Sequence, residues 1–529
     1  MTLSRRTFLH KIGAAGGSAA VYQMALALGL MPGVAHGAVV PVRPLNGSRR
    51  SVVLLGGGLS SLMCAYELEK AGYQCTILEA LHRIGGRNLT IRTGDLVDEM
   101  GNQQRCDFDD DPHIYFNAGP ARIPAHHHYL LHYCRELQVP LETFVNINYN
   151  GWVHDSNTFG GKPVRFRQYV TDARGFIAEL SSKSIRAEEF DAQMSADDVE
   201  KVLQFIRNYG DLGANALYAG SNRGGYRQPG ITAPTAGMLE PGTVHDSLDF
   251  SELLKSDFWR YRMHFGESED QAAPLLQAVG GMDGIVKGFV RNIRSNMLTH
   301  AQVKSIQIRE DGVAVIYQHK GRNKQINADY CMNCIPKHLL TGIDNNFPRE
   351  YIEALSAIGR GKMFKIGIQM RERFWEREDI YGGISWTDQN IEQLWYPPHG
   401  IHKSKGVMLG AYTFNANNAE FFARMNPAER FEAAIQQGEK LHPDYRKYAE
   451  KSVSVAWHRM NHIMGCTAQW TPDARQRYFK LLQTPVAGRH YLMGDQISYH
   501  PGWQEGAFSS AHNALNHLQA RVAGEQARS

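Results

Sequence analysis

Residues 51–87 read SVVLLGGGLSSLMCAYELEKAGYQCTILEALHRIGGR, and they decide the fold of this chain. The apolar run at residues 52–55 is typical of a strand buried in a parallel sheet. Gly56 and Gly58 follow, and glycines at these positions let backbone N–H groups approach a pyrophosphate. The next residues predict a helix, whose positive N-terminal end would face the same phosphates. A strand, a glycine turn and a helix in this order predict a dinucleotide-binding unit.

A second predicted strand at residues 74–78 strengthens this prediction. It ends at Glu79, 21 residues after Gly58. At this offset a carboxylate would accept hydrogen bonds from an adenosine ribose. The third glycine of the usual pattern is replaced by Ser61, which still allows the helix to pack closely on the first strand.

The residues after Glu79 indicate which dinucleotide is bound. A second glycine pair, Gly85 and Gly86, is flanked by Arg83 and Arg87, and arginine offers planar, charge-assisted donors to phosphate. The whole stretch resembles the flavin-containing amine oxidases, which share a glycine turn, an LEA segment and RxGGR. The resemblance implies FAD as the cofactor. The implied binding residues in this stretch are Gly56, Gly58, Ser61, Glu79, Ala80, Arg83, Gly86 and Arg87.

Length and composition describe an ordinary globular protein. The 529 residues suffice for two or three domains, and 43% of them are apolar while 21% are charged. The formal net charge is only +4, and no basic block interleaved with aromatic residues supports nucleic-acid binding. Seven cysteines are too few to suggest a disulfide scaffold. Cys331 and Cys334 form a CxxC pattern, which we interpret as strand packing, with a redox or metal role as the alternative.

Residues 1–37 resemble a twin-arginine export signal. Arg5 and Arg6 precede a Gly/Ala-rich apolar stretch, and residues 35–37 offer small side chains for signal cleavage. A membrane anchor is the alternative, but glycines interrupt the stretch. We therefore expect export of the folded protein to the periplasm or the medium, with no membrane attachment after cleavage. No other segment is long and apolar enough for a transmembrane helix.

The expected fold class is α/β, with three parts. The patterns predict a discontinuous Rossmann-like FAD-binding domain, a substrate-binding domain with a mixed sheet, and a helical subdomain over the active site. Predicted strands at 364–370 and 407–411 would belong to the mixed sheet. The FAD-binding domain comprises residues 48–118, 280–340 and 455–522, the substrate-binding domain 119–171 and 341–454, and the helical subdomain 172–279.

Two further segments extend the resemblance to this family. Residues 280–283 match its GGMD turn, and Val303 in the following strand is implied as a cofactor contact. Near the C-terminus, residues 494–507 resemble the flavin signature. There Asp495 would accept a hydrogen bond from the ribityl chain, and the helix that opens at Ala507 would stabilise negative charge on the flavin. Trp503 would form a wall beside the flavin, and the carbonyl group of Gly502 would accept from the substrate amine.

Residues 119–124, GPARIP, resemble the GPMRxP segment of the L-amino acid oxidases, in which the arginine holds the substrate α-carboxylate. A guanidinium binds two carboxylate oxygens at once, which fixes the orientation of the substrate. The resemblance implies this role for Arg122, and places Gly119 beside the cofactor; a structural arginine is the alternative. Tyr396 lies in a WYPP segment similar to the family's YYP, and it would either assist Arg122 or serve as a packing aromatic.

Lys365 lies in an apolar, strand-like run, ten residues before Trp375. A lysine in such a run is costly unless it has a polar partner. The family places a lysine at this spacing, where it holds a water near flavin N5. The implied role of Lys365 is assistance to reoxidation of the reduced flavin by O2, and a lysine on an edge strand is the alternative.

Cys466 follows Trp457 by nine residues, as does the cysteine that is bonded to the flavin in monoamine oxidases. A covalent flavin link and a small buried thiol both remain open for it.

A histidine cluster after Pro124 suggests a metal site at first sight. Two of its members would share a helix face, but no nearby carboxylate or cysteine set completes a site. We therefore expect capping, packing and solvent contact, and no metal. The cluster consists of His126, His127, His128 and His132.

Together these features predict an FAD-dependent L-amino acid oxidase. Hydride would pass from the α-carbon to flavin N5, O2 would reoxidise the flavin to give H2O2, and the imine would hydrolyse to a 2-oxo acid and ammonia. The expected partners are an L-amino acid, O2 and a second copy of the chain in a homodimer. Three alternatives stay open: an amine oxidase without carboxylate selectivity, an amino acid 2-monooxygenase yielding an amide and CO2, and a flavin dehydrogenase or non-catalytic flavoprotein. The side chain of the substrate is not readable from the sequence, and only the helical segment offers candidates, which are Phe258, Trp259, Tyr261 and His264.

Overall fold

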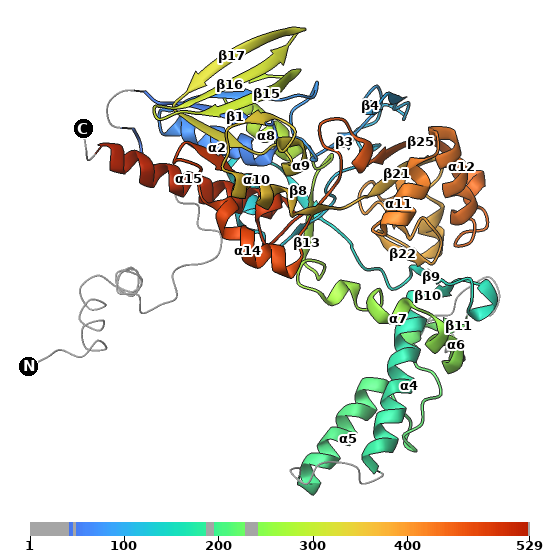
Figure 1. The fold of residues 1–529 in the computed structure, drawn as a ribbon. Helices are drawn as coiled ribbons and strands as arrows, with labels where there is room; N and C mark the ends of the chain where they lie inside the picture. Colours follow the sequence, from blue (N-terminus) through green and yellow to red (C-terminus); the bar gives the residue numbers. More distant parts are fainter. Residues whose placement is uncertain (1–41, 46–48, 187–194, 228–241, 527–529) are drawn as a thin grey trace, which may run out of the picture.

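The computed structural model of the chain describes residues 42–45, 49–186, 195–227 and 242–526. The predicted export signal at residues 1–37 lies outside these ranges. The described chain forms two bodies of mixed helices and sheets, and a pair of helices extends away from both of them (Figure 1). This arrangement confirms the predicted α/β class.

The first body is built on a parallel sheet of five strands. All four of its strand pairings are parallel, so long crossover connections must join neighbours. Strands from each of the three segments assigned to the FAD-binding domain meet here. The order is β14 (Asn296–Leu298), β2 (Gln74–Leu78), β1 (Ser51–Leu55), β18 (Tyr330–Asn333) and β27 (His490–Leu492).

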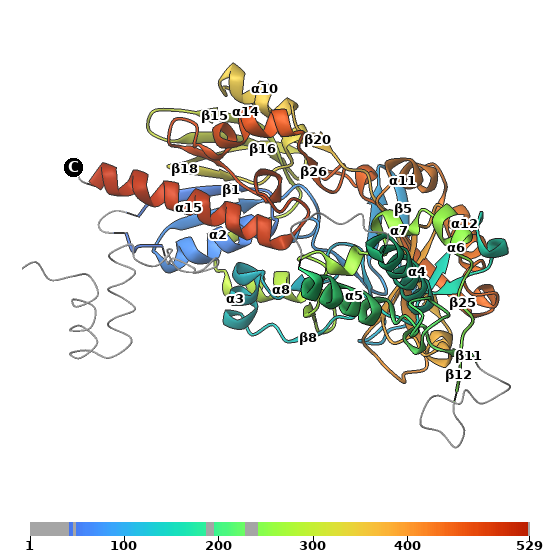
Figure 2. The same ribbon diagram turned by 90° about the horizontal axis from the view of Figure 1, so that it is seen from below.

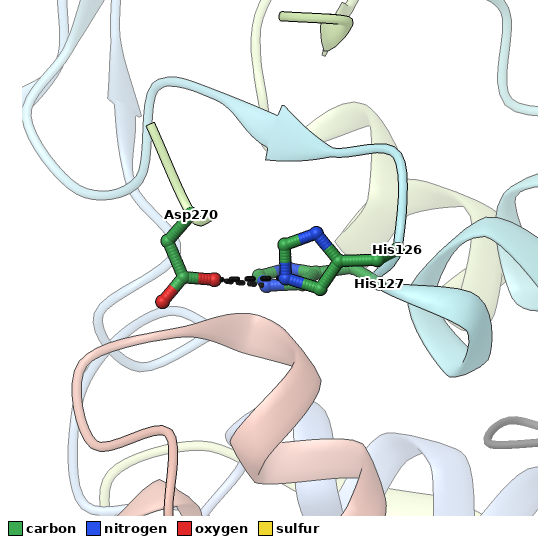
Figure 3. Close-up of side chains that lie close together, drawn as sticks. All are labelled: His126, His127 and Asp270. Atoms are coloured by element: carbon green, nitrogen blue, oxygen red, sulfur yellow. Dashed lines mark hydrogen bonds and ion pairs between the residues drawn. The ribbon is translucent and has the colours of Figure 1, made fainter. Parts of the chain in front are cut away.

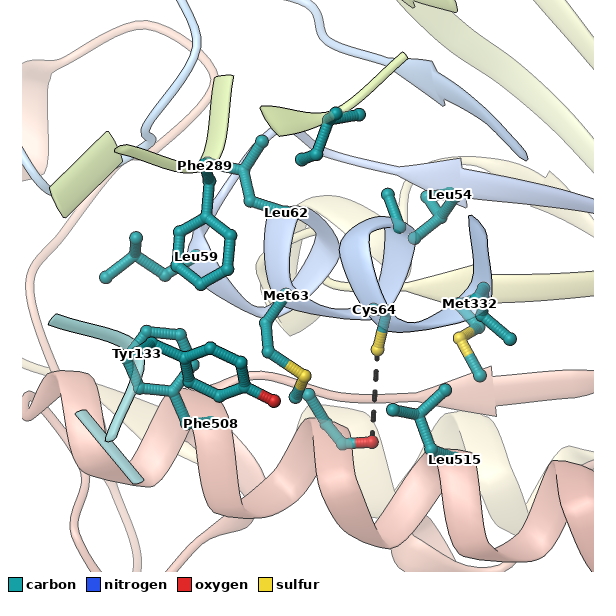
Figure 4. Close-up of a cluster of buried hydrophobic side chains, with 14 of the residues drawn as sticks. Leu54, Leu59, Leu62, Met63, Cys64, Tyr133, Phe289, Met332, Phe508 and Leu515 are labelled. Atoms are coloured by element: carbon teal, nitrogen blue, oxygen red, sulfur yellow. Dashed lines mark hydrogen bonds between the residues drawn. The ribbon is translucent and has the colours of Figure 1, made fainter. Parts of the chain in front are cut away.

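Both faces of this sheet are covered, which explains the continuous apolar run of β1. Val52 and Leu54 point to a cluster formed by helices, while Val53 and Leu55 point to the opposite cluster. On the helical face, α2 (Leu59–Lys70) packs between the sheet and the long C-terminal helix α15 (Gln504–Gln526) (Figures 2 and 4). Phe289, Tyr133 and Phe508 fill the end of this layer.

A second sheet covers the other face. Its central hairpin joins β15 (Ala301–Ile308) to β16 (Val313–His319), and β17 (Arg322–Ala328) pairs with β16. Val315 and Leu355 bury their side chains against β1 from this side. Leu355 belongs to α10 (Arg349–Ser356).

The second body contains a mixed sheet of seven strands. The predicted strands at 364–370 and 407–411 are observed as β21 (Phe364–Met370) and β24 (Gly406–Thr413), which pair antiparallel. All residues of β21 are buried. The full order is β10 (Val164–Arg165), β9 (Trp152–His154), β22 (Gly383–Thr387), β23 (Gln393–Tyr396), β24, β21 and β25 (Ala449–Ala456).

The second body is also held together by a buried ion pair. The Arg430 guanidinium on α12 (Pro427–Gly438) bonds both carboxylate oxygens of Glu99, at 2.7 and 3.1 Å. Neither side chain has any exposed surface. Glu99 also accepts from the N–H of Ala456, so the pair ties together three segments that are far apart in the sequence.

The helical subdomain consists mainly of α4 (Phe166–Arg186) and α5 (Ala196–Gly210), which extend from the second body (Figure 1). Ser195 and Asp198 form a capping box that starts α5. The end of the segment assigned to this subdomain is not helical, because it forms strand β13 (Leu275–Ala278). Among the described residues, no helix has the length and apolar character needed to cross a membrane.

Candidate cofactor and substrate site

A cavity of about 530 Å³ opens at the carboxyl ends of β1 and β2. This is where open parallel sheets bind nucleotide ligands, and the volume is within the range of ligand pockets. Ser61, Arg83, Arg122, Lys365 and Tyr396 do not line it. Most of the other predicted cofactor residues do, namely Gly56, Gly58, Glu79, Ala80, Gly86, Arg87, Gly119, Val303, Asp495, Trp503 and Ala507, together with Gly502 and Cys466.

The glycine turn is shaped for a phosphate ligand. Gly56 has φ +87°, and a Cβ on Gly57 would come within 3.1 Å of the Glu79 carboxylate. The helix α2 begins after Gly58 without a hydrogen bond from the N-cap side chain, and Gly58, Leu59 and Ser60 at its N-terminus line the cavity. A Cβ on Gly86 would meet the Cα of Gly58 at 3.5 Å, which brings the second glycine turn against the first. These features fit the diphosphate of FAD.

The Glu79 carboxylate stabilises the glycine turn by hydrogen bonds to backbone N–H groups. One carboxylate oxygen accepts from Gly57 N at 2.6 Å and the other from Leu81 N at 2.7 Å. Ser61 lies on the far side of the turn, where its Oγ contacts Cys334 Sγ at 3.2 Å. Ser61 therefore supports helix packing, as the sequence indicated, and the structure does not show it lining the cavity.

Arg83, like Ser61, does not line the cavity. One of its terminal nitrogens is buried without a hydrogen-bond partner among the described residues. Burial lowers the pKa of Arg83 to about 10, so the side chain remains charged at neutral pH.

Arg87 and Asp495 form an ion pair across the cavity. The Arg87 guanidinium contacts both carboxylate oxygens of Asp495 and donates to the carbonyl of Cys466. Burial by itself would lower the pKa of Arg87, but the Asp495 carboxylate outweighs it and the pKa is raised. Asp495 also accepts from Gly502 N at 2.7 Å, which fixes the turn that carries Trp503. The ion pair between Arg87 and Asp495 therefore connects the RxGGR segment near the N-terminus with the flavin-signature segment near the C-terminus.

Arg122 is a buried cation surrounded by aromatic rings. Its guanidinium lies 4.8 Å from the centroid of Trp395, 5.6 Å from Trp503 and 5.7 Å from Phe265. The residue is 7% exposed, and its side chain makes no hydrogen bond to any described residue. Burial lowers the pKa of Arg122 to about 10, which still leaves it charged at neutral pH. The charge of Asp270 partly opposes this effect, but no described carboxylate contacts Arg122. A buried charge without an ion-pair partner is costly, so the site favours an anionic ligand.

Lys365 is buried beside the same segment. Its Nζ donates to the carbonyl of Gly119 at 2.6 Å and lies 4.2 Å from the ring centroid of Tyr412. Burial, together with the charge of Arg122, lowers the pKa of Lys365 to about 7. The amine therefore changes its charge near neutral pH. Its role in holding a water stays a prediction.

Tyr396 does not assist Arg122. Adjacent residues of a strand point to opposite faces, and Trp395 is the residue of β23 that contacts Arg122. The Tyr396 hydroxyl instead bonds Ser385 Oγ at 2.6 Å and His442 Nε2 at 2.7 Å, inside a separate core. The structure thus favours the alternative interpretation of Tyr396 as a packing residue.

Tyr412 takes the position that the sequence analysis expected for Tyr396. It lies on β24 directly opposite Lys365 of β21, and it lines the cavity. Burial raises the pKa of Tyr412, which the neighbouring Arg122 partly opposes, so the hydroxyl stays protonated. Its hydroxyl has no hydrogen-bond partner among the described residues and is a suitable donor to an anion at Arg122. No local sequence motif marks Tyr412. Its position follows from its cross-strand pairing with Lys365, which is set by the register of the sheet.

Cys466 lines the cavity beside Arg87. Its N–H donates to the carbonyl of Gly361 at 3.0 Å, and burial raises the pKa of its thiol. Trp457, the other member of the spacing, donates from Nε1 to the Ala118 carbonyl at 2.9 Å. Both interpretations of Cys466, a covalent flavin link and a small buried thiol, fit this location.

The histidine cluster has a carboxylate that the sequence did not reveal. Asp270 Oδ1 lies 3.0 Å from His126 Nε2 and 3.1 Å from His127 Nε2 (Figure 3). The three ligand atoms lie within 4.8 Å of one another, as in a metal site, but both imidazoles already bond one carboxylate oxygen. His132 instead pairs with Glu136 on the helix surface.

The prediction that these histidines cap the following helix is wrong for His127, the residue at the N-cap position. His127 precedes helix α3 (His128–Glu136), but its side chain makes no capping bond. Glu505 of α15 accepts from the N–H groups of Tyr129 and Leu130, at 3.0 and 2.9 Å. A carboxylate at a helix N-terminus also matches the sign of the helix dipole.

Comparisons with known proteins find similarity over most of this chain. The family model described as "Flavin containing amine oxidoreductase" matches residues 59–515. The "Flavin-dependent L-tryptophan oxidase RebO" of Lentzea aerocolonigenes is 26% identical over 500 residues, covering 90% of this chain and 99% of the relative. An "L-amino-acid oxidase" of Demansia vestigiata is 27% identical over 477 residues, covering 87% and 85%. The solved structure of wild-type putrescine oxidase bound to putrescine is similar in fold, with a TM-score of 0.57 and 18% identity, over 91% of this chain and 99% of that one.

Proposed function

Because the chain belongs to the flavin-containing amine oxidoreductases and uses FAD, we propose that it is an L-amino acid oxidase. In the proposed reaction an L-amino acid, O2 and water yield a 2-oxo acid, ammonia and H2O2. The observation that carries this proposal is the environment of Arg122. Its guanidinium is buried, and no carboxylate of a described residue forms an ion pair with it. A simple amine carries no anion that would need such a group, whereas an α-carboxylate does.

Each residue of the site has a proposed task. Arg122 and Tyr412 bind the substrate carboxylate, and the carbonyl of Gly502 accepts a hydrogen bond from the amine. Trp503 limits the space beside the ring of the cofactor. Bound FAD supplies the hydride acceptor and the site of reaction with O2. Similarity to an L-tryptophan oxidase and to L-amino-acid oxidases supports the same assignment.

Lys365 is assigned to the oxidative half of the cycle. Its amine lies behind Gly119 and Tyr412, and its lowered pKa lets it exchange a proton near neutral pH. A group with a pKa close to the working pH is suited to proton transfer. We propose that it assists proton delivery when O2 is reduced.

Export remains a separate proposal that depends on the sequence of residues 1–37. Arg5, Arg6 and the small residues at 35–37 support transport by the twin-arginine route to the periplasm or medium. N-terminal sequencing of the protein isolated from its producing cell tests this directly. A mature N-terminus near residue 38 is expected, and an intact residue 1 contradicts it. We also propose a homodimer, which size-exclusion chromatography with light scattering checks.

The experiment for the main proposal is anaerobic reduction of the bound flavin by matched substrate pairs. Each L-amino acid is compared with the amine that lacks its carboxylate, for example L-tryptophan with tryptamine and L-lysine with cadaverine. Bleaching by amino acids alone, followed by H2O2 release on admitting O2, is the expected result. Bleaching by the amines alone excludes the carboxylate role of Arg122 and indicates an amine oxidase. An amide and CO2 as products would indicate a monooxygenase.

A further inference from the structure

Four side-chain contacts and the backbone from Phe265 to Asp270 together form a closed circuit that includes Arg122. Arg122 packs on Trp503 and on Phe265. Trp503 packs on His127, with ring centroids 5.1 Å apart and planes at 88°. His127 bonds Asp270, which follows Phe265 by five residues in the same connecting segment. We call these five residues the Arg122 circuit.

The bond between Asp270 and His127 closes this circuit. His127 is 1% exposed, and its Nε2 lies 3.1 Å from Asp270 Oδ1. Burial lowers the pKa of His127, so the ring is a neutral donor at Nε2. His126 donates to the same oxygen, at 3.0 Å, from the partly exposed side (Figure 3). The hydrogen bond to His127 lowers the pKa of Asp270, which keeps the acceptor ionised.

Arg122 depends on ring contacts for its orientation. Among the described residues its side chain has no hydrogen-bond partner, and cation–π attraction does not by itself fix the rotation of a guanidinium. The Trp503 indole likewise makes no hydrogen bond to any described residue, so packing by His127 and Arg122 holds it. A carboxylate must meet two N–H groups in one plane, so a small rotation of Arg122 weakens binding.

We propose that Asp270 and His127 are a positioning pair for substrate binding: they hold Trp503 against Arg122 and so orient the guanidinium toward the substrate carboxylate. Neither residue of the pair lines the cavity. The inference rests on the proposed function, because it assumes that Arg122 binds a carboxylate. It assigns a function to two residues outside the cavity lining.

The test compares Asp270→Leu and Asp270→Asn in the FAD-loaded enzyme. Leucine cannot accept a hydrogen bond, whereas the asparagine oxygen can accept from both imidazoles. Asp270→Leu is expected to raise the KM of the amino acid about tenfold or more, corresponding to about 1.4 kcal/mol, and to change kcat less than threefold. Asp270→Asn should restore KM to within about threefold of the wild type. The neighbouring Glu269→Gln is the matched control, because Glu269 is exposed and should leave KM unchanged.

A second variant keeps the test decisive if Asp270→Leu does not fold. His127→Phe retains a ring against Trp503 but cannot bond Asp270, and it should raise KM to a similar degree. Combined with Asp270→Leu it should add little, because residues that act as a unit are not additive. Titration with benzoate, followed by flavin absorbance, measures carboxylate binding without turnover. The affinity for benzoate should fall in each variant by about the factor by which KM rises.

Two outcomes would overturn the proposal. In the first, Asp270→Leu and His127→Phe leave KM and benzoate affinity unchanged. In the second, kcat falls together with FAD content or thermal stability while KM and benzoate affinity stay constant, as a merely structural role would require. If no amino acid reduces the wild-type flavin and benzoate does not bind, both this proposal and the proposed function are refuted. If amino acids reduce it and the variants match it, this proposal alone is refuted.

Discussion

Replacement of Lys365 by methionine is expected to stabilise the FAD-free protein at neutral pH, although it removes a hydrogen bond. The amine is 2% exposed, and burial lowers its pKa from 10.5 to about 7. A shift of about 3.5 units corresponds to roughly 5 kcal/mol, at 1.36 kcal/mol per unit. This is the free-energy cost of burying the amine at pH 7 and below. Methionine, which is of similar volume and apolar, does not carry this cost.

The sign of the pH dependence follows from proton binding. The unfolded chain keeps the proton up to about pH 10.4, whereas the folded protein releases it near pH 7. Between these values the unfolded state binds more protons, so the free energy of unfolding of the wild type rises with pH. The cost is fully present below about pH 7 and is gone above about pH 10.5. Methionine does not titrate, so the difference between the two proteins must shrink as the pH rises.

The lost bond to Gly119 reduces the expected gain. Leaving the Gly119 carbonyl without its 2.6 Å partner costs about 1–3 kcal/mol. Lys365→Met should therefore be more stable by about 2–4 kcal/mol at pH 7. The advantage should fall by about 1.4 kcal/mol per pH unit and vanish near pH 9.

Urea unfolding of the FAD-free protein, followed by tryptophan fluorescence at pH 6, 7, 8 and 9, measures this difference. Lys324→Met, at an exposed strand position, is the control and should show no such trend. A difference that stays constant or grows with pH refutes the argument that the buried amine is neutral in the folded state. In the FAD-loaded variant, reoxidation by O2 should slow by about 10²-fold while anaerobic reduction is retained, as loss of a proton-transfer group predicts.

Three further predictions concern other residues. Arg122→Met should lower kcat/KM for amino acids by about 30- to 4000-fold, which corresponds to the 2–5 kcal/mol of a truncated buried charge pair; steady-state H2O2 assays check it, and an equal loss on the matching amines contradicts it. Glu99→Leu should cost about 3–5 kcal/mol of unfolding free energy because Arg430 is left buried without its partner, while Glu99→Leu/Arg430→Met should recover most of it in urea unfolding. Acid precipitation of the holoenzyme should release all the flavin, because burial raises the pKa of the Cys466 thiol and little thiolate forms. Flavin that stays in the pellet and is lost in Cys466→Ala would establish the covalent link.

The FAD unit was readable from the sequence because its determinants are local. Gly56, Gly58 and Glu79 lie on one strand–turn–helix–strand unit, and the backbone geometry of that unit depends mainly on its own residues. The continuous apolar run of β1 likewise predicted burial on both faces, and in the structure helices cover one face and a second sheet covers the other.

Only the tertiary structure decided which groups meet at the substrate site. In sequence a family-like segment marks Tyr396 and no motif marks Tyr412, but the register of β21 with β24 brings Tyr412 beside Lys365, and the alternation of β23 turns Tyr396 away. Asp270 reaches His127 across 143 residues of sequence. A side chain's neighbours across a sheet or between segments depend on register and packing of the whole chain, which short-range patterns do not encode. The sequence therefore determined the cofactor and the family, and the folded structure determined which residues surround Arg122.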